Sequence, residues 1–193
     1  MKISKLVDQI YFIEDILDLQ NYPDLFQTVK EEAGFNKKGR TGRRMCRMTN
    51  NGLKYTLFGK PYARKDYTET VQRIRKEIEQ KLQFKEDYFN TCTLNYYDNG
   101  ASGFGDHTDK MPDLERPMIV ATLTLGNSNR IMTLTNMYTR RQYGIRLPHN
   151  SLLLMGPQMQ DMYLHGIPKE KGLLESRLSL SFRRQKVKLN KVI

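Results

Sequence analysis

The alternation of apolar and polar positions separates a front part of mixed elements from a back part made of strands. Within residues 67–82, four apolar side chains recur at helical spacing with charged residues between them: Val71, Ile74, Ile78 and Leu82. This pattern predicts the clearest helix of the chain. We expect a strand over residues 10–17 and a short helix over residues 22–35 that ends near Gly34. The stretch LKYTLFG, residues 53–59, is β-like and stops at a Gly-Lys-Pro turn.

Beyond residue 86 the pattern changes to short alternating segments separated by turn residues. The expected strands are residues 88–97, 118–126, 130–138, 141–148, 151–156 and 176–184. Many short strands at close spacing are typical of a β-sandwich or barrel, and a jelly roll is the natural candidate for about eight of them. We therefore expect an α+β fold in one domain, with an α/β front half packed on an all-β half.

Length and composition agree with one folded domain, because 193 residues with 38% hydrophobic content are enough for a proper core. Cys46 and Cys92 lie far apart and form no C-x-x-C pair, and acids occupy the region where a signal peptide needs an apolar run. No run approaches the ~20 apolar residues of a membrane span. We expect a soluble, intracellular monomer with two free thiols and no membrane partner, nuclear if the source is a eukaryote.

Basic residues exceed acidic ones, with 32 Lys and Arg against 21 Asp and Glu and a formal net charge of +11. Such a surface attracts polyanions, and the commonest polyanion in a cell is the nucleic-acid backbone. Three stretches concentrate the charge: residues 36–47, 138–146 and 182–191. The first of them is expected to be a loop. A merely soluble basic protein, with solvated loops at these stretches, is the alternative.

The stretch GDHTD, residues 105–109, places a histidine two positions before an aspartate. On a strand, residues i and i+2 point to the same face, so His107 and Asp109 can bind one ion together. A lone H-x-D also arises by chance or in turns, so a third ligand is needed, and His165 on another expected strand supplies it. Two imidazoles and one carboxylate leave three open positions on an octahedral ferrous ion. The remaining histidine, His149, has turn-forming neighbours and is expected in a turn.

Two arginines on the last expected strand fit the same chemistry. Arg177 and Arg183 are separated by an even number of positions, so both face one side of the strand. Buried arginines need anions: Arg177 could hold the distal carboxylate of a dicarboxylate cosubstrate, and Arg183 could pair with Asp109 or with the metal-bound end of that cosubstrate. The alternative is that both face solvent on an edge strand.

Three motifs together resemble the AlkB family of iron- and 2-oxoglutarate-dependent nucleic-acid demethylases: FNTCTLNYYDNGASGFGDHTD, LPHNSLLLMGPQMQDMYLHGIP and RLSLSFR. The resemblance covers roughly residues 43–185, includes LKYTLFG as a recognition lid, and is strongest to the members that repair alkylated DNA. It implies a double-stranded β-helix (jelly-roll) core over residues 86–186. It also implies an N-terminal α/β extension over residues 1–85, which forms a nucleotide-recognition lid, and a basic tail over residues 187–193.

The resemblance further implies roles for individual residues. Ligands of Fe(II) would be His107, Asp109 and His165; contacts to the cosubstrate 2-oxoglutarate would be Asn95, Tyr97, Arg177, Ser179 and Arg183; and contacts to substrate would be Arg43, Arg44, Tyr55, Leu57 and Phe58. The implied substrate is DNA or RNA with N-alkylated bases, which is demethylated with release of succinate, carbon dioxide and formaldehyde. A base within a duplex must be flipped out to reach such a site.

The chain departs from the family pattern at three places. Residues 110–112 follow the H-x-D motif with Lys-Met-Pro, where repair members commonly have acids that position the damaged base. Ser179 and Ser181 stand where Asn and Thr are usual. Leu57, followed by Phe58, stands where an aromatic side chain would stack on the target base.

Two other classes of function remain open from the sequence. One is an iron and 2-oxoglutarate oxygenase that acts on RNA, a protein side chain or a small molecule. The other is a catalytically silent nucleic-acid binder with the same fold, which an intact ligand set disfavours.

Overall fold

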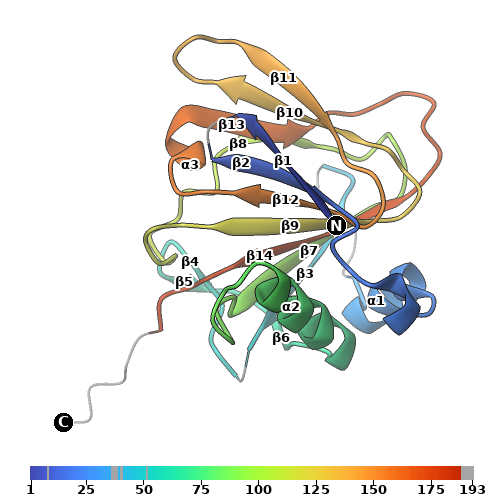
Figure 1. Ribbon diagram of the computed structural model, residues 1–193, viewed down its shortest axis with the longest axis vertical. Coiled ribbons are helices and arrows are strands. Elements are labelled where there is room, and N and C mark those ends of the chain that lie inside the picture. Colours follow the sequence, from blue (N-terminus) through green and yellow to red (C-terminus); the bar gives the residue numbers. More distant parts are fainter. Residues whose placement is uncertain (8, 36–38, 40, 51, 188–193) are drawn as a thin grey trace.

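Two β-sheets enclose the interior in the described part of the computed structural model, which covers residues 1–193 except 8, 36–38, 40, 51 and 188–193 (Figure 1). The larger sheet has the strand order β1 (Lys2–Val7), β2 (Ile10–Glu14), β12 (Ser151–Met155), β9 (Val120–Leu125), β14 (Arg177–Arg183), β7 (Thr91–Tyr97), β3 (Arg44–Thr49) and β6 (Lys65–Asp66). The smaller sheet has the order β11 (Gln142–Arg146), β10 (Ile131–Asn136), β13 (Tyr163–Ile167) and β8 (Phe104–His107). A hairpin is formed by β4 (Thr56–Leu57) and β5 (Lys60–Pro61).

The principal helices lie on the outer face of the larger sheet, where Figure 1 shows α1 (Leu25–Ala33) and α2 (Glu69–Lys81) beside β14, β7 and β3. The Thr68 side chain accepts a hydrogen bond from the backbone of Val71 and so caps the start of α2, and α1 ends at Gly34 with φ +52°. Both helix predictions are confirmed. The described chain also has a short 3-10 helix, η1 (Leu19–Asn21), and a single helical turn, α3 (Met159–Met162).

Strand β14 shows how the sequence positions the interior. Its even positions are apolar, and Leu178, Leu180 and Phe182 are fully buried in the core between the larger sheet and the helices. Burial of each such side chain stabilises the fold by about 1.5–3 kcal/mol. Its odd positions are polar and face the space between the sheets, because successive side chains on a strand point to opposite faces.

The predicted jelly-roll core is confirmed, and its strands pair antiparallel, with β14 between β9 and β7. The expected strands over residues 130–138 and 141–148 form the hairpin β10–β11, in which Ile131 pairs with Arg146. The N-terminal part supplies edge strands to the larger sheet, because β1 and β2 lie at one end of its strand order and β3 and β6 at the other. The division into extension, core and tail stays a prediction, and residues 188–193 of the basic tail lie outside the described residues.

Several boundaries were predicted wrongly. The basic stretch was expected to be a loop, but Arg44–Thr49 is strand β3, because it pairs with β7 along its whole length; residues 36–38 and 40 of that stretch lie outside the description. The β-like segment 53–59 is reduced to the two residues of β4. The first expected strand ends at Glu14, and its partner β1 was not predicted.

Two smaller predictions on individual side chains are confirmed. Cys46 and Cys92 are free thiols, and both are buried. His149 lies in a turn, where its Nδ1 accepts a hydrogen bond from the backbone of Gly126. In the described part of the chain, none of the helices is long and apolar enough to cross a membrane.

Candidate metal centre and substrate pocket

A cavity of about 210 Å³ lies between the two sheets. Its floor is formed by inward-facing residues of β3, β7 and β14, its far wall by β8, β10 and β13, and part of its rim by hairpin β4–β5. The cavity therefore collects polar side chains from segments that are far apart in the sequence.

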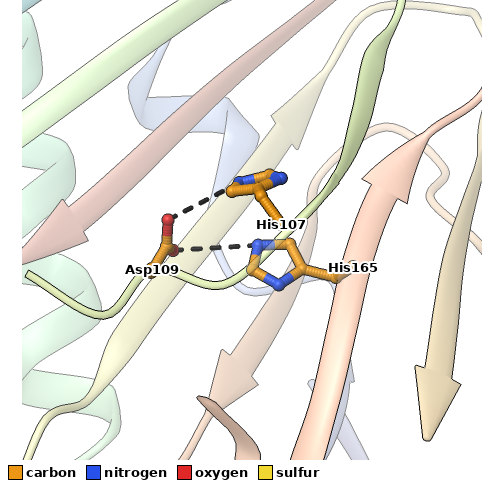
Figure 2. Close-up of side chains that lie close together, drawn as sticks. All are labelled: His107, Asp109 and His165. Atoms are coloured by element: carbon orange, nitrogen blue, oxygen red, sulfur yellow. Dashed lines mark ion pairs between the residues drawn. The ribbon is translucent and has the colours of Figure 1, made fainter. Parts of the chain in front are cut away.

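His107, Asp109 and His165 meet in this cavity, with ligand atoms that all lie within 4.8 Å of one another (Figure 2). Nε2 of His107 is 3.7 Å from Oδ1 of Asp109, and Nε2 of His165 is 3.8 Å from Oδ2. The sequence placed His107 and Asp109 on one strand, which was wrong, since β8 ends at His107. The pairing of β8 with β13 instead sets His107 directly opposite His165.

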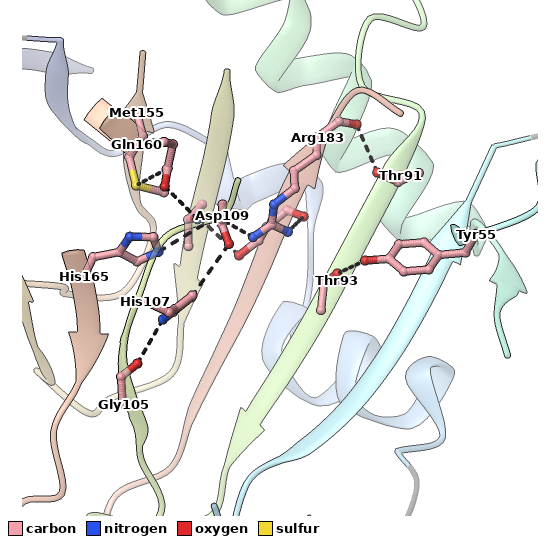
Figure 3. Close-up of polar contacts among 12 residues, drawn as sticks. Tyr55, Thr91, Thr93, Gly105, His107, Asp109, Met155, Gln160, His165 and Arg183 are labelled. Atoms are coloured by element: carbon pink, nitrogen blue, oxygen red, sulfur yellow. Dashed lines mark hydrogen bonds and ion pairs between the residues drawn. The ribbon is translucent and has the colours of Figure 1, made fainter. Parts of the chain in front are cut away.

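The Asp109 carboxylate is held in its ionised form. Burial alone would raise its pKa, but the Arg183 guanidinium and the two imidazoles outweigh burial and hold the pKa of Asp109 far below its usual range. Arg183 donates a hydrogen bond to Oδ2 of Asp109 over 2.7 Å, and the Asp109 backbone N–H donates to Oε1 of Gln160 (Figure 3). These contacts fix both the charge and the position of the carboxylate.

The two imidazoles are placed to bind a metal. Burial lowers the pKa of His165 to about 4, so its ring is neutral at physiological pH. Nδ1 of His107 lies 2.9 Å from the carbonyl oxygen of Gly105, which leaves Nε2 on the side of Asp109. Two imidazoles and one carboxylate match the facial ligand set of non-haem iron, so these residues fit Fe(II).

Arg177 is a fully buried cation without a carboxylate partner among the described residues. It donates to Oγ1 of Thr124 over 2.9 Å, and its Cζ lies 5.5 Å from the centroid of the Tyr97 ring. Burial lowers the pKa of Arg177 to about 10, which still leaves it protonated at neutral pH. An isolated buried charge is costly, so this position calls for an anion.

Unsatisfied polar atoms support the fit to a polar ligand. Within the described part of the chain, several buried atoms of cavity-lining residues have no hydrogen-bond partner: Oδ1 of Asn95, Nδ1 of His165, and Nε of Arg177 and Arg183. Buried polar groups are normally hydrogen-bonded, and such a cluster marks a place where a ligand supplies the missing partners. Tyr97 and Ser179 line the same wall, as the sequence predicted for a cosubstrate site.

The five residues predicted to contact substrate divide into two groups. Arg43, Tyr55 and Leu57 line the cavity. Arg44 does not line the cavity, because it directly follows Arg43 and successive side chains on a strand point to opposite faces. Its Nη2 pairs with Oδ1 of Asp98 at 3.3 Å. Phe58 is 70% exposed at the tip of the hairpin and is also outside the lining.

Hairpin β4–β5 is fastened to the core by two polar side chains. Asp113 accepts hydrogen bonds from Oγ1 of Thr56 and from the backbone of Gly59. Gln185, which is buried, accepts from the backbone of Thr56 and donates to the carbonyl of Lys54. These bonds hold Tyr55 and Leu57 over the cavity.

A family model described as the 2OG-Fe(II) oxygenase superfamily matches residues 9–183. The chain belongs to this superfamily. Its fold agrees, since the structure of OsALKBH1 superposes with a TM-score of 0.68 at 17% identity, covering 95% of this chain and 100% of that one. A prolyl-4-hydroxylase from Pseudomonas putida superposes with a TM-score of 0.58 at 15% identity, covering 93% of this chain and 94% of that one.

Curated relatives are similar in sequence over much of the chain. DNA oxidative demethylase ALKBH2 of Mus musculus is 26% identical over 157 residues, which cover 78% of this chain and 64% of that protein. The ALKBH2 of Homo sapiens is also 26% identical, over 78% of this chain and 59% of its own. Alpha-ketoglutarate-dependent dioxygenase alkB homolog 3 of Bos taurus is 31% identical over 49% of this chain and 36% of its own. The chain thus spans less than two thirds of the length of these relatives.

Several residues that line the cavity of this 2OG-Fe(II) oxygenase chain were not predicted from the sequence. They include Met45, Thr93, Phe104 and Thr122. From the sequence, Arg47 was noted only within the basic stretch, and Met111 only as a departure from the family pattern. A signal for Met45 and Arg47 exists in the alternation of β3, whose intervening residues Cys46 and Met48 are buried in the core on the opposite face. The signal was missed because the arginines made the segment resemble a solvated loop.

Proposed function

We propose that this protein is an Fe(II)- and 2-oxoglutarate-dependent dioxygenase that demethylates N-alkylated bases in nucleic acid. One observation carries the proposal: the His107, Asp109 and His165 cluster shares a cavity with Arg177, a fully buried guanidinium that lacks a carboxylate partner among the described residues. The cluster fits the metal, and Arg177 fits the far carboxylate of a dicarboxylate cosubstrate.

The residues of the chain have separate tasks in the proposed reaction. His107, Asp109 and His165 would hold the metal, and Arg183 keeps the Asp109 carboxylate ionised and oriented. When bound, iron and 2-oxoglutarate together supply the oxidation of a methyl C–H bond by oxygen, which ends in release of formaldehyde from the base. Arg177, Asn95, Tyr97 and Ser179 would orient the cosubstrate.

Nucleic acid is the proposed substrate because positive charge gathers on the cavity lining and over the whole chain. Arg43, Arg47 and Tyr55 line the cavity, and Cζ of Arg47 lies 5.6 Å from the centroid of the Tyr55 ring. The formal net charge of +11 favours a polyanion. The names of the curated relatives, DNA oxidative demethylase and alkB homolog, support the same substrate class. A target base within a duplex would be flipped out to enter, at a cost of a few kcal/mol.

The test is a turnover assay on short oligonucleotides that each carry one methylated base, with succinate release and the mass of the oligonucleotide as readouts. We expect loss of one methyl group in step with succinate, and neither product without iron. DNA and RNA versions of each oligonucleotide are compared in parallel with methylated peptides and free nucleosides. If only a peptide or a nucleoside were demethylated, that compound, and not nucleic acid, would be the substrate of this oxygenase.

A further inference from the structure

The cavity has an unbalanced set of charged side chains. Its described lining includes four arginines, Arg43, Arg47, Arg177 and Arg183, but Asp109 is the one carboxylate among the described lining residues. Asp109 is already committed to Arg183 and to the metal site. A substrate base in this cavity would therefore meet cationic groups and no free carboxylate of the described lining.

Acids near the cavity are engaged outside it. Each has a hydrogen-bond or ion-pair partner that is not part of the described lining: Asp98 with Arg44, Asp106 with Thr133, Asp113 with Thr56 and Gly59, and Asp161 with Lys110. None of these four carboxylates belongs to the described lining. The position two residues beyond Asp109 faces the cavity, and it is occupied by an uncharged side chain, Met111.

Arg43 and Arg47 are fixed in place by aromatic rings. Cζ of Arg43 lies 3.3 Å from the centroid of the Phe104 ring. Cζ of Arg47 lies 5.0 Å from the Tyr62 ring and 5.6 Å from the Tyr55 ring. Neither arginine forms an ion pair with a described acid that would neutralise it. Arginine stays protonated in proteins, so both charges are permanent.

The imbalance remains when the proposed cofactors are bound. The charges of a divalent metal and of a dicarboxylate cancel each other, and Asp109 cancels Arg183. Within that balance Arg177 would pair with the far carboxylate of the cosubstrate, and Arg43 and Arg47 are left without an acidic partner in the described lining. A cation that enters such a cavity is repelled, whereas a carbonyl oxygen accepts hydrogen bonds from the guanidinium groups.

Resting on the proposed function, we propose that the cavity selects electrically neutral methylated bases that present a carbonyl edge, and rejects cationic methylated bases. Ring-nitrogen methylation makes adenine and cytosine cationic at neutral pH, whereas uracil, thymine and guanine methylated on a ring N–H stay neutral and keep their carbonyl oxygens. The preferred substrate class is therefore the methylated uracil, thymine or guanine type, with Arg43 and Arg47 as the selecting residues.

A matched pair of lesions tests this selection. N3-methylcytosine and N3-methyluracil have almost the same size and carry the methyl group on the same atom, but only the first is a cation. Placed in otherwise identical single-stranded oligonucleotides, the uracil lesion should be demethylated with a kcat/KM at least roughly tenfold higher, because like charges brought together in a protein site cost several kcal/mol. Equal or higher kcat/KM for the cytosine lesion would overturn the selection and leave the proposed function standing.

Binding provides a readout that does not depend on turnover. The same two oligonucleotides are titrated without oxygen into protein loaded with Mn(II) and 2-oxoglutarate. The neutral lesion should bind more tightly than the cation, relative to an unmethylated control. If neither lesion is demethylated, the proposed function fails, and the order of the two affinities still decides the selection: tighter binding of the cation would refute it.

A new carboxylate at position 111 should reverse the preference. Met111→Glu adds an acid to the lining, and Met111→Gln is the matched uncharged control. We expect Met111→Glu to raise the ratio of cytosine to uracil turnover by about tenfold over Met111→Gln, with metal content measured for both. A ratio that is the same in the two variants would show that charge at this wall does not select the base.

Substitution at a second position of the lining, Arg47, gives an independent check of the charge selection. Arg47→Gln removes one selecting charge, whereas Arg44→Gln removes a charge from the opposite face of β3, outside the lining. Arg47→Gln should lower the ratio of kcat/KM for the uracil lesion to kcat/KM for the cytosine lesion several-fold, and Arg44→Gln should leave this ratio unchanged. Equal effects of the two variants would assign the preference to overall charge and would contradict the proposal.

Discussion

The Arg183 guanidinium lies 2.7 Å from the Asp109 carboxylate, and both side chains are buried. The contact joins the last strand of the larger sheet to the segment that follows β8 of the smaller sheet. One metal ligand is therefore positioned by a strand of the opposite sheet. The same contact explains why Arg183 and Arg177, which share a face of β14, should differ in their effects when changed.

We predict that Arg183→Gln weakens metal binding. Loss of the guanidinium leaves the Asp109 carboxylate free to rotate, and loss of such an outer partner of a metal ligand typically costs about 10- to 100-fold in affinity. Titration of the apoprotein with Mn(II) measures the change. Unaltered affinity would mean that Gln160 and the backbone alone position Asp109.

Arg177→Gln should separate cosubstrate binding from metal binding. Metal content should stay near normal, while the 2-oxoglutarate concentration for half-maximal turnover should rise roughly thirtyfold or more, since a lost buried charge pair costs about 2 to 5 kcal/mol. Metal analysis and succinate release at varied 2-oxoglutarate give both values. An unchanged requirement for 2-oxoglutarate would refute the assignment of Arg177.

Asp109→Ala should abolish metal binding and turnover, because it removes one of three protein ligands. The wild-type protein should bind one divalent metal per chain. Asp106→Asn serves as the control, since Asp106 is exposed and hydrogen-bonds Thr133 on the smaller sheet. Full activity of Asp109→Ala, or an equal loss in the control, would contradict the metal site.

Asp113→Ala should loosen hairpin β4–β5. The carboxylate accepts hydrogen bonds from Thr56 and Gly59. Because Asp113 is half-buried, the contribution of these bonds to the stability of the hairpin is limited. We expect hydrogen exchange at the Gly59 amide to accelerate by roughly tenfold, together with a higher KM for the oligonucleotide and an unchanged KM for 2-oxoglutarate. Glu115→Ala is the control, because Glu115 pairs with Arg184. A hairpin amide that exchanges at the wild-type rate would show that Gln185 suffices.

The salt dependence of oligonucleotide binding should identify the face of β3 that meets phosphate. If Arg43 and Arg47 face the base, as proposed, their joint replacement by Gln should leave the slope of log affinity against log salt near the wild-type value, whereas loss of two phosphate contacts to a single strand would reduce it by about 1.4. Arg44→Gln should change the slope little, because Arg44 is paired with Asp98. A salt-independent affinity of the wild type would argue against nucleic acid as the substrate.

The sequence predicted the elements whose periodicity is strong. The helix over residues 67–82 and the strand that holds Arg177 and Arg183 combine a clear apolar pattern with local capping or turn residues, and both are present. The shared face of the two arginines followed from spacing alone, since an even separation on a strand cannot place them on opposite sides. The pairing of Arg183 with Asp109 was likewise one of the expected contacts.

Features that depend on tertiary pairing were harder to predict. The alternation of strand β3 is obscured because arginines occur on both of its faces, Arg44 on one and Arg47 on the other, and pairing with β7 decides its conformation. Asp109 lies beyond the end of β8, and it reaches the histidines because Arg183 and Gln160 hold it there. Arg44 and Phe58 lie outside the cavity because of the strand face of β3 and the turn of hairpin β4–β5. Neither feature can be recognised from the identity of a single residue.

The division of β14 into two faces has a consequence for engineering. Substitutions at single positions change one contact, but deletion or insertion of one residue between Arg177 and Arg183 would exchange the faces of the remaining strand, sending aliphatic groups to the cofactor site and hydroxyl groups into the apolar core. Variant libraries for new substrates should therefore keep the length of this strand constant. Hairpin β4–β5, whose tip is exposed, is the place where changes in length can be accommodated.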